Sequence, residues 1–179
     1  CLRGGVMRLV SCLTQGHNLR LVGLAAILCI LGCLTTVRLF QRLRFAEEGA
    51  RLAWTFMGAV ATGATIWCTH FVAILAYRPG VAVAYEPLLT GVSLVLAIGG
   101  GGVALNVASR RFRFAGEIGG ALFGLAVAGM HYVGMAAFAA DGIVQWSAPY
   151  VAASVLAALL FGCLAFNPAR VGGRYDVLL

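Results

Sequence analysis

Five long apolar segments, separated by short polar connections, dominate the hydropathy pattern of this chain. A helix rises about 1.5 Å per residue, so roughly 20 apolar residues are enough to cross the hydrocarbon core of a bilayer. The pattern therefore predicts an all-α fold, a polytopic transmembrane helical bundle of about five spans. The expected spans are Leu19 to Phe40, Leu52 to Tyr77, about Tyr85 to Ala108, about Phe114 to Phe138, and about Trp146 to Phe166.

Glycines interrupt two of these segments in different ways. Gly99 to Gly102 form an unbroken run inside the third segment, which permits either a kink or a very close helix contact. In the fourth segment Gly116, Gly120 and Gly124 recur every four residues and so share one helix face. Small residues at this spacing let a neighbouring backbone approach closely. We therefore expect the fourth span to lie in the middle of the bundle.

Composition supports a membrane protein and excludes a water-soluble globular domain. Hydrophobic residues make up 61% of the chain and charged residues 11%, whereas soluble domains carry about 25% charged residues. The net charge of +7 comes from arginines, which lie mostly in short connections between apolar segments. We interpret them as topology signals rather than as a nucleic-acid-binding surface, so nucleic acid is not an expected partner.

The arginines are distributed unequally between the two sides of the predicted bundle. Cytoplasmic connections near span ends are enriched in Lys and Arg, so the richer side is expected to be cytoplasmic. This places the N-terminus outside and the C-terminus in the cytoplasm. The inner side holds Arg38, Arg42, Arg44, Arg51, Arg110, Arg111, Arg113, Arg170 and Arg174, and the outer side holds Arg3, Arg8, Arg20 and Arg78.

Two apolar segments carry matching histidine motifs. The first reads His70-Phe71-Val72-Ala73-Ile74-Leu75-Ala76-Tyr77 and the second His131-Tyr132-Val133-Gly134-Met135-Ala136-Ala137-Phe138, and the two histidines are 61 positions apart. Such spacing is typical of a repeat of two membrane helices. The chain is therefore predicted to contain a repeated helical hairpin that presents one histidine per unit at equal depth, in the outer half of the bundle. The third repeat is incomplete.

The second motif contains a donor set suited to a soft metal ion. His131 and Met135 are four residues apart and share one helix face, while Met130 flanks them. Imidazole and thioether ligands favour copper, and the absence of nearby carboxylates argues against magnesium, calcium or manganese. We predict a copper site formed by His70, His131, Met135 and Met130. The alternative is that each histidine forms a hydrogen bond between helices and that methionine fills space.

These residues resemble the MHYT domain, an integral-membrane sensory module of bacteria. Met130-His131-Tyr132-Val133-Gly134-Met135 differs from the name motif only at Val133, and Trp67 to Tyr77 is similar to the divergent first motif of the family. The resemblance implies a location in the bacterial inner (plasma) membrane and three motifs near the outer face. It also implies that their His and Met side chains hold copper, which would sense oxygen, carbon monoxide or nitric oxide. Family members often continue into cytoplasmic domains for cyclic di-GMP turnover or into histidine kinases.

Two departures from the family pattern bear on metal binding. Thr69 and Ile74 stand where the family often has methionine, and no third motif follows the fifth span. Weaker copper binding than in a complete family member is expected.

The expected domains are an extracytoplasmic segment at 1–18, an MHYT-like transmembrane sensor domain at 19–166 and a cytoplasmic tail at 167–179.

The predicted function is that of a membrane sensor for a diatomic gas or redox state, acting on a cytoplasmic output domain. No Ser-His-Asp set, phosphate-binding loop or carboxylate pair is found in the sequence, so this chain is not expected to be an enzyme by itself. The alternatives are a haem-binding electron carrier with His70 and His131 as axial ligands, or a module without ligand. The sequence leaves a homo-oligomer open.

Overall fold

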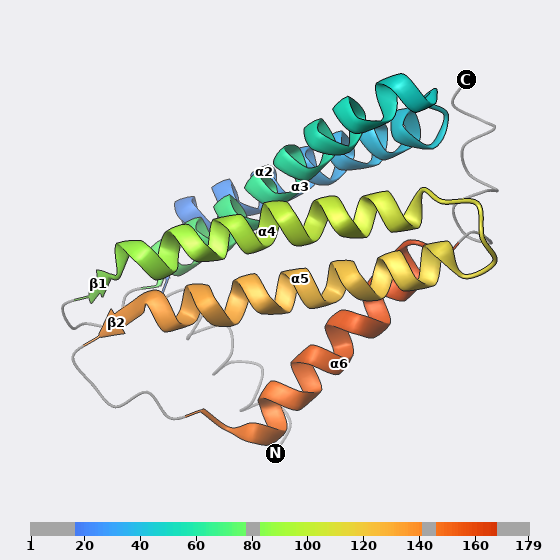
Figure 1. Ribbon diagram of the computed structural model, residues 1–179. Helices are drawn as coiled ribbons and strands as arrows, with labels where there is room; N and C mark the ends of the chain where they lie inside the picture. Colours follow the sequence, from blue (N-terminus) through green and yellow to red (C-terminus); the bar gives the residue numbers. More distant parts are fainter. Residues whose placement is uncertain (1–16, 78–82, 141–145, 168–179) are drawn as a thin grey trace, which may run out of the picture.

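Five helices cross the bundle, and each is long and apolar enough to span a membrane (Figure 1). The computed structural model describes residues 17–77, 83–140 and 146–167. The predicted all-α architecture is confirmed. Expectations for most of the N-terminal segment and of the cytoplasmic tail, and for Arg78, lie outside the described residues. The elements are α2 (Leu19–Arg44), α3 (Glu48–Ala76), β1 (Val83–Tyr85), α4 (Pro87–Ala108), α5 (Ala115–Ala137), β2 (Phe138–Ala140) and α6 (Ala148–Ala165).

The first connection is shorter than the hydropathy pattern predicted. We expected a polar connector from Gln41 to Arg51, but α2 continues to Arg44 and α3 begins at Glu48. Arg, Gln and Glu are good helix formers, so the helices extend beyond the apolar segments. The two helices therefore form a tight hairpin whose charged turn lies at the end of the spans.

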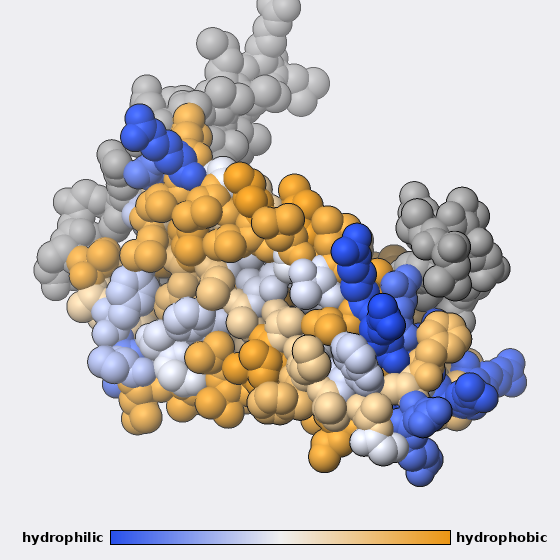
Figure 2. Space-filling model, turned by 90° about the horizontal axis from the view of Figure 1, so that it is seen from above, coloured by the Kyte–Doolittle hydropathy of each residue, from blue (hydrophilic) through white to orange (hydrophobic). Residues whose placement is uncertain are grey.

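The helices pack in the order of the sequence. α3 lies between α2 and α4, and α5 lies between α4 and α6. The expected internal position of the fourth span is confirmed for α5, which shares the interior with α3 and α4. Large apolar side chains such as Ile30, Val95 and Phe161 face outward. Figure 2 shows a largely hydrophobic surface with hydrophilic groups gathered mainly toward one end, as expected for a bundle in lipid.

Small residues at the helix interfaces explain the close packing. The helix containing Gly99 to Gly102 is continuous, so close contact is the alternative that the structure realises. A Cβ atom added at Gly102 would lie 2.9 Å from the Cβ of Ala59 on α3, and one added at Gly100 would lie 2.5 Å from the Cβ of Ala126 on α5. The close contacts of α4 with α3 and with α5 therefore depend on the glycines of α4.

The repeated hairpin is visible in the backbone at the end opposite to Arg44, Arg51, Arg110 and Arg111, which form the arginine-rich end. His17 pairs with Tyr77 across the α2–α3 hairpin, and β1 pairs with β2 across the α4–α5 hairpin, with Tyr85 opposite Phe138. In both units, the residue just before the first helix donates a backbone hydrogen bond to the last residue of the second helix. The Asn18 N–H donates to Ala76 O at 2.8 Å, and the Glu86 N–H donates to Ala137 O at 2.9 Å. We call this end the ribbon end.

The side chains of the same two residues cap the helices that follow. Asn18 accepts a hydrogen bond from the Arg20 N–H at 3.1 Å, and Glu86 accepts from the Leu88 and Leu89 N–H groups at 3.0 and 2.5 Å. Side-chain oxygens at this position satisfy backbone donors that have no partner inside the helix. Each unit therefore begins with a residue that caps its first helix and donates a hydrogen bond to the last residue of its second helix.

Candidate metal centre

The two motif histidines contact each other near the ribbon end. His70 on α3 and His131 on α5 have their Nδ1 atoms 3.4 Å apart, and their ring centroids are 5.0 Å apart at an interplanar angle of 76°. Each lies six residues before the end of its helix. The expectation that the histidines of the two units lie at equal depth and face each other is confirmed. Which ring nitrogen carries the proton depends on the tautomer.

Gly134 makes this approach possible. A Cβ atom added at Gly134 would lie 2.8 Å from Nε2 of His70 and 3.1 Å from its Cδ2. The imidazole of His70 therefore packs directly on the backbone of α5, one turn after His131. The sequence gives the glycine, but only the structure shows that it accommodates the histidine of the other unit.

The two methionines of the predicted set have different environments. Met130 is fully buried and lies four residues before Gly134, so it occupies the face of α5 that meets His70. Met135 is half-buried and lies one turn after His131. Among the described residues, no cluster of three or more His, Cys, Asp or Glu side chains suits a metal ion. A metal centre here would thus use two imidazoles and thioether sulfur.

Two polar atoms beside the histidine contact lack partners. Nε2 of His70 and Oγ1 of Thr69 are buried, and neither forms a hydrogen bond to any described residue. Buried polar atoms are nearly always satisfied, so an unsatisfied pair is typical of a place where a water, an ion or a ligand binds. Both atoms belong to α3 and lie inside the bundle.

Aromatic side chains surround the pair. On α3, Phe71 contacts His70 with ring centroids 5.2 Å apart, and Tyr85 on β1 lies 6.0 Å from Phe71. On α5, Tyr132 contacts His131 at 5.1 Å, and its hydroxyl hydrogen-bonds to Ser154 of α6. Burial raises the pKa of the Tyr85 phenol above its usual value. Aromatic side chains therefore flank both imidazoles.

The contacts that position these aromatic side chains were not predicted from the sequence. Ser154 lies in an apolar segment that gave no sign of a contact with Tyr132. The pairing of β1 with β2 was also missed, because strands of three residues are too short to produce a hydropathy pattern.

Comparison with known families agrees with this geometry. A family described as "MHYT: Bacterial signalling protein N terminal repeat" matches residues 63–121 and 124–177. Each matched range contains one of the two histidines. The chain belongs to the MHYT family. The resemblance inferred from the motifs is thus confirmed, and the two matched ranges begin within α3 and within α5, just before the histidine of each.

Three curated relatives of this MHYT chain are signalling proteins of much greater length. An "Uncharacterized signaling protein" of Caulobacter vibrioides is 42% identical over 145 residues, which is 79% of this chain and 18% of the relative. The "Cyclic di-GMP phosphodiesterase NbdA" of Pseudomonas aeruginosa is 34% identical over 86% of this chain and 20% of the relative. The "Bifunctional diguanylate cyclase/cyclic di-GMP phosphodiesterase MucR" of the same species is 32% identical over 93% of this chain and 25% of the relative.

This MHYT chain therefore spans a quarter or less of the length of these relatives. None of the solved structures matches the chain significantly.

Proposed function

We propose that this MHYT chain is a membrane sensory module that detects a diatomic gas or a change of redox state through a copper site. His70, His131, Met135 and Met130 would hold the ion. The observation that carries the proposal is the 3.4 Å contact between the Nδ1 atoms of His70 and His131, which come from different units of the repeat.

The donor atoms suit a single copper ion. For metal–nitrogen bonds of about 2.0 Å, two nitrogens of a tetrahedral site lie about 3.3 Å apart, close to the observed separation. Imidazole and thioether ligands are borderline to soft and favour copper. A haem group is not supported, because the two imidazoles contact each other directly and leave no space for a porphyrin between them.

The arrangement of the ligands suggests how binding would be transmitted. A bound copper ion would supply a coordination position for oxygen, carbon monoxide or nitric oxide. His70 belongs to α3 and His131 to α5, and these helices make few other direct contacts because both pack mainly on α4. A change in the distance between the two imidazoles therefore shifts one hairpin unit relative to the other. Differential binding of a ligand to the two arrangements would be the source of the signal.

The output would belong to another part of a longer protein. Two relatives are named as enzymes of cyclic di-GMP metabolism, and this chain covers only a fraction of each. We propose that the arginine-rich end faces the cytoplasm of a bacterial inner membrane, with the N-terminus outside, and that it connects to a cyclic di-GMP or kinase output domain.

Copper content of purified variants tests the site. We expect the wild-type chain, purified and reconstituted with copper, to retain about one ion per chain. His70→Ala and His131→Ala each remove an imidazole and should lower the retained copper at least tenfold, because loss even of supporting groups around a metal ligand costs about 10- to 100-fold in affinity.

His17→Ala is the matched control, because His17 is the remaining histidine of the chain and its ring lies against Tyr77 rather than in the pair. It should retain wild-type copper. Unchanged copper in both pair variants, with helicity intact by circular dichroism, would show that the two histidines form only a hydrogen bond between helices.

A further inference from the structure

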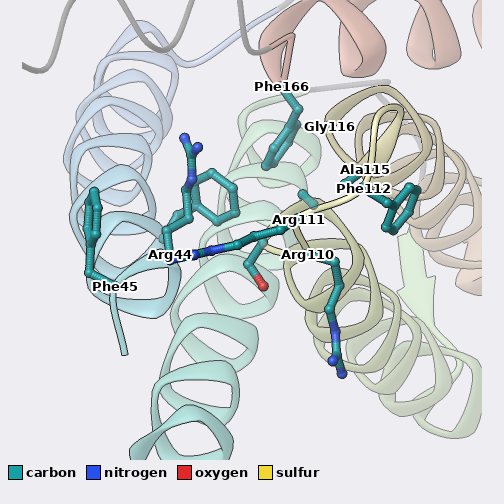
Figure 3. A pocket seen from close by; sticks show the side chains of 11 residues that line it. Arg44, Phe45, Arg110, Arg111, Phe112, Ala115, Gly116 and Phe166 are labelled. Atoms are coloured by element: carbon teal, nitrogen blue, oxygen red, sulfur yellow. The ribbon is translucent and has the colours of Figure 1, made fainter. Parts of the chain in front are cut away.

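A cavity opens at the arginine-rich end of the bundle, opposite to the histidine pair. It has a volume of about 250 Å³ and lies where the C-terminal ends of α2, α4 and α6 meet the beginning of α5. Three arginines line it, Arg44 from α2 and Arg110 and Arg111 from the α4–α5 connection. Figure 3 shows Arg111 reaching toward α2, where Arg44 lies, whereas Arg110 points away.

The arginines that line this cavity form no ion pair with a carboxylate among the described residues. Arg44 and Arg111 form no ion pair or hydrogen bond with any described residue, and Arg110 bonds only to the Asn106 side chain at 3.2 Å. Glu117, on the first turn of α5, is not among the lining residues. Two cations that line one cavity without an ion-pair partner repel each other, so the cavity favours an anion.

A fourth arginine supports the floor of the cavity. Arg51 donates a hydrogen bond from Nη2 to Oγ of Ser109 at 2.6 Å, and Ser109 is a buried lining residue. The Nε atom of Arg51 is buried and has no partner among the described residues. The guanidinium group of Arg51 is thus held close to the cavity by its hydrogen bond to Ser109.

The remaining wall is aromatic. Phe40 and Phe166 line the cavity and meet edge to face at 5.4 Å between ring centroids, which joins α2 to the end of α6. Phe45 also lines it and is 83% exposed. The cavity therefore combines guanidinium groups with apolar surface at the point where the membrane-spanning helices end.

We propose that this cavity binds the headgroup of an anionic phospholipid, with the phosphate beside Arg44 and Arg111 and the lipid chains against Phe40 and Phe166. Guanidinium groups bind phosphate oxygens in a bidentate manner. Basic pockets between membrane helices at the headgroup level bind anionic lipids. A lipid fits the site better than free phosphate, because only a lipid also covers the apolar wall. The site does not depend on copper, so its test is independent of the sensor function.

Native mass spectrometry of the purified chain tests the site. The chain in neutral detergent is incubated with phosphatidylglycerol or with phosphatidylcholine that carries the same acyl chains. Wild-type protein should retain phosphatidylglycerol about tenfold better, because the lining arginines attract an anionic headgroup more strongly than a zwitterionic one. Arg44→Gln with Arg111→Gln should abolish this preference, while Arg44→Lys with Arg111→Lys should retain part of it.

The matched control is Arg38→Gln with Arg113→Gln, which removes the same charge from α2 and from the α4–α5 connection without altering the cavity lining. It should keep the preference. Equal retention of the two lipids by wild type, or equal loss in the lining and control variants, would overturn the proposal. If the glutamine pair does not fold, competition on wild type decides: displacement of phosphatidylglycerol by glycerol phosphate as effectively as by more lipid would show a free phosphate site instead.

Discussion

At the residue scale, the histidine pair depends on a small residue as much as on the histidines. The imidazole of His70 lies against Gly134, where any side chain would occupy its place. Thr69, the neighbour of His70, stands in the position that Met130 holds in the second motif, and its hydroxyl is buried without a partner in the part of the chain that the structure describes. The first motif therefore supplies an imidazole and an unsatisfied hydroxyl, where the second supplies an imidazole and two thioethers. This asymmetry agrees with the expectation of weak copper binding.

A methyl group at Gly134 should separate the two imidazoles. In Gly134→Ala the new Cβ would lie 2.8 Å from Nε2 of His70, so the ring must move. We expect the retained copper to fall about tenfold while both histidines remain present, an effect typical of groups that position metal ligands. Metal analysis of the purified variant measures it.

The control for this change is Gly129→Ala on the same helix, where an added Cβ would meet nothing within 4 Å. It should bind copper as the wild type does. Equal copper in Gly134→Ala and wild type would mean that the position of the His70 ring does not matter for binding.

At the element scale, glycines determine which helix surfaces come into contact. A Cβ atom at Gly120 would lie 2.6 Å from the backbone carbonyl carbon of Gly162 on α6, and one at Gly124 would lie 2.6 Å from that of Ala158. The α5–α6 contact is therefore backbone against backbone over two turns. Apolar side chains alone do not drive helices together in lipid, so close packing of this kind provides the attraction.

Leucine at Gly120 should disrupt this interface. A backbone atom cannot move aside as a flexible side chain can, so the cost should exceed the usual 1–3 kcal/mol of an overpacked core. We expect Gly120→Leu to lower the melting temperature in detergent strongly or to prevent folding.

The matched variant Gly129→Leu adds the same bulk to the same helix at a position with open space around it, and it should fold normally. Similar melting temperatures for the two variants would show that the α5–α6 contact does not stabilise the bundle.

At the scale of the whole molecule, the two ends of the bundle differ in chemistry. The ribbon end holds the histidine pair among aromatic side chains, while the other end holds Arg44, Arg51, Arg110 and Arg111 around a cavity. Arginine-rich connections are seldom translocated across the membrane, so the arginine-rich end should stay in the cytoplasm. The candidate site for a gas would then lie in the outer half of the membrane, and the proposed lipid site in the inner leaflet.

Cysteine accessibility tests this orientation. In a chain whose native cysteines are replaced, Arg111→Cys should resist a membrane-impermeant thiol reagent applied to intact cells, while Ala84→Cys on β1 should react. Both should react after the membrane is opened. Labelling of Arg111→Cys in intact cells would reverse the proposed topology.

Hydropathy and motif spacing determined the spans, the repeat and the pairing of the histidines. A continuous apolar segment of about 20 residues crosses lipid as a helix, because a helix satisfies its backbone groups within the segment, so five such segments predict five helices. Equal positions of His70 and His131 within equivalent helices implied equal depth, and the structure confirms it. The glycine stripe likewise indicated that α5 is an inner helix.

Contacts between helices were decided only by the tertiary structure. The sequence did not show that Gly134 faces His70, that Ser154 meets Tyr132, or that Arg44 and Arg111 converge on one cavity. Each depends on how far one helix is rotated and shifted against another, which side-chain packing determines and periodicity within one helix does not. The pairing of β1 with β2 could not be predicted for a similar reason, because its hydrogen bonds join residues that come together only after the helices of the hairpin have packed. The sequence therefore determined which residues lie at which depth, and packing between helices determined which of them touch.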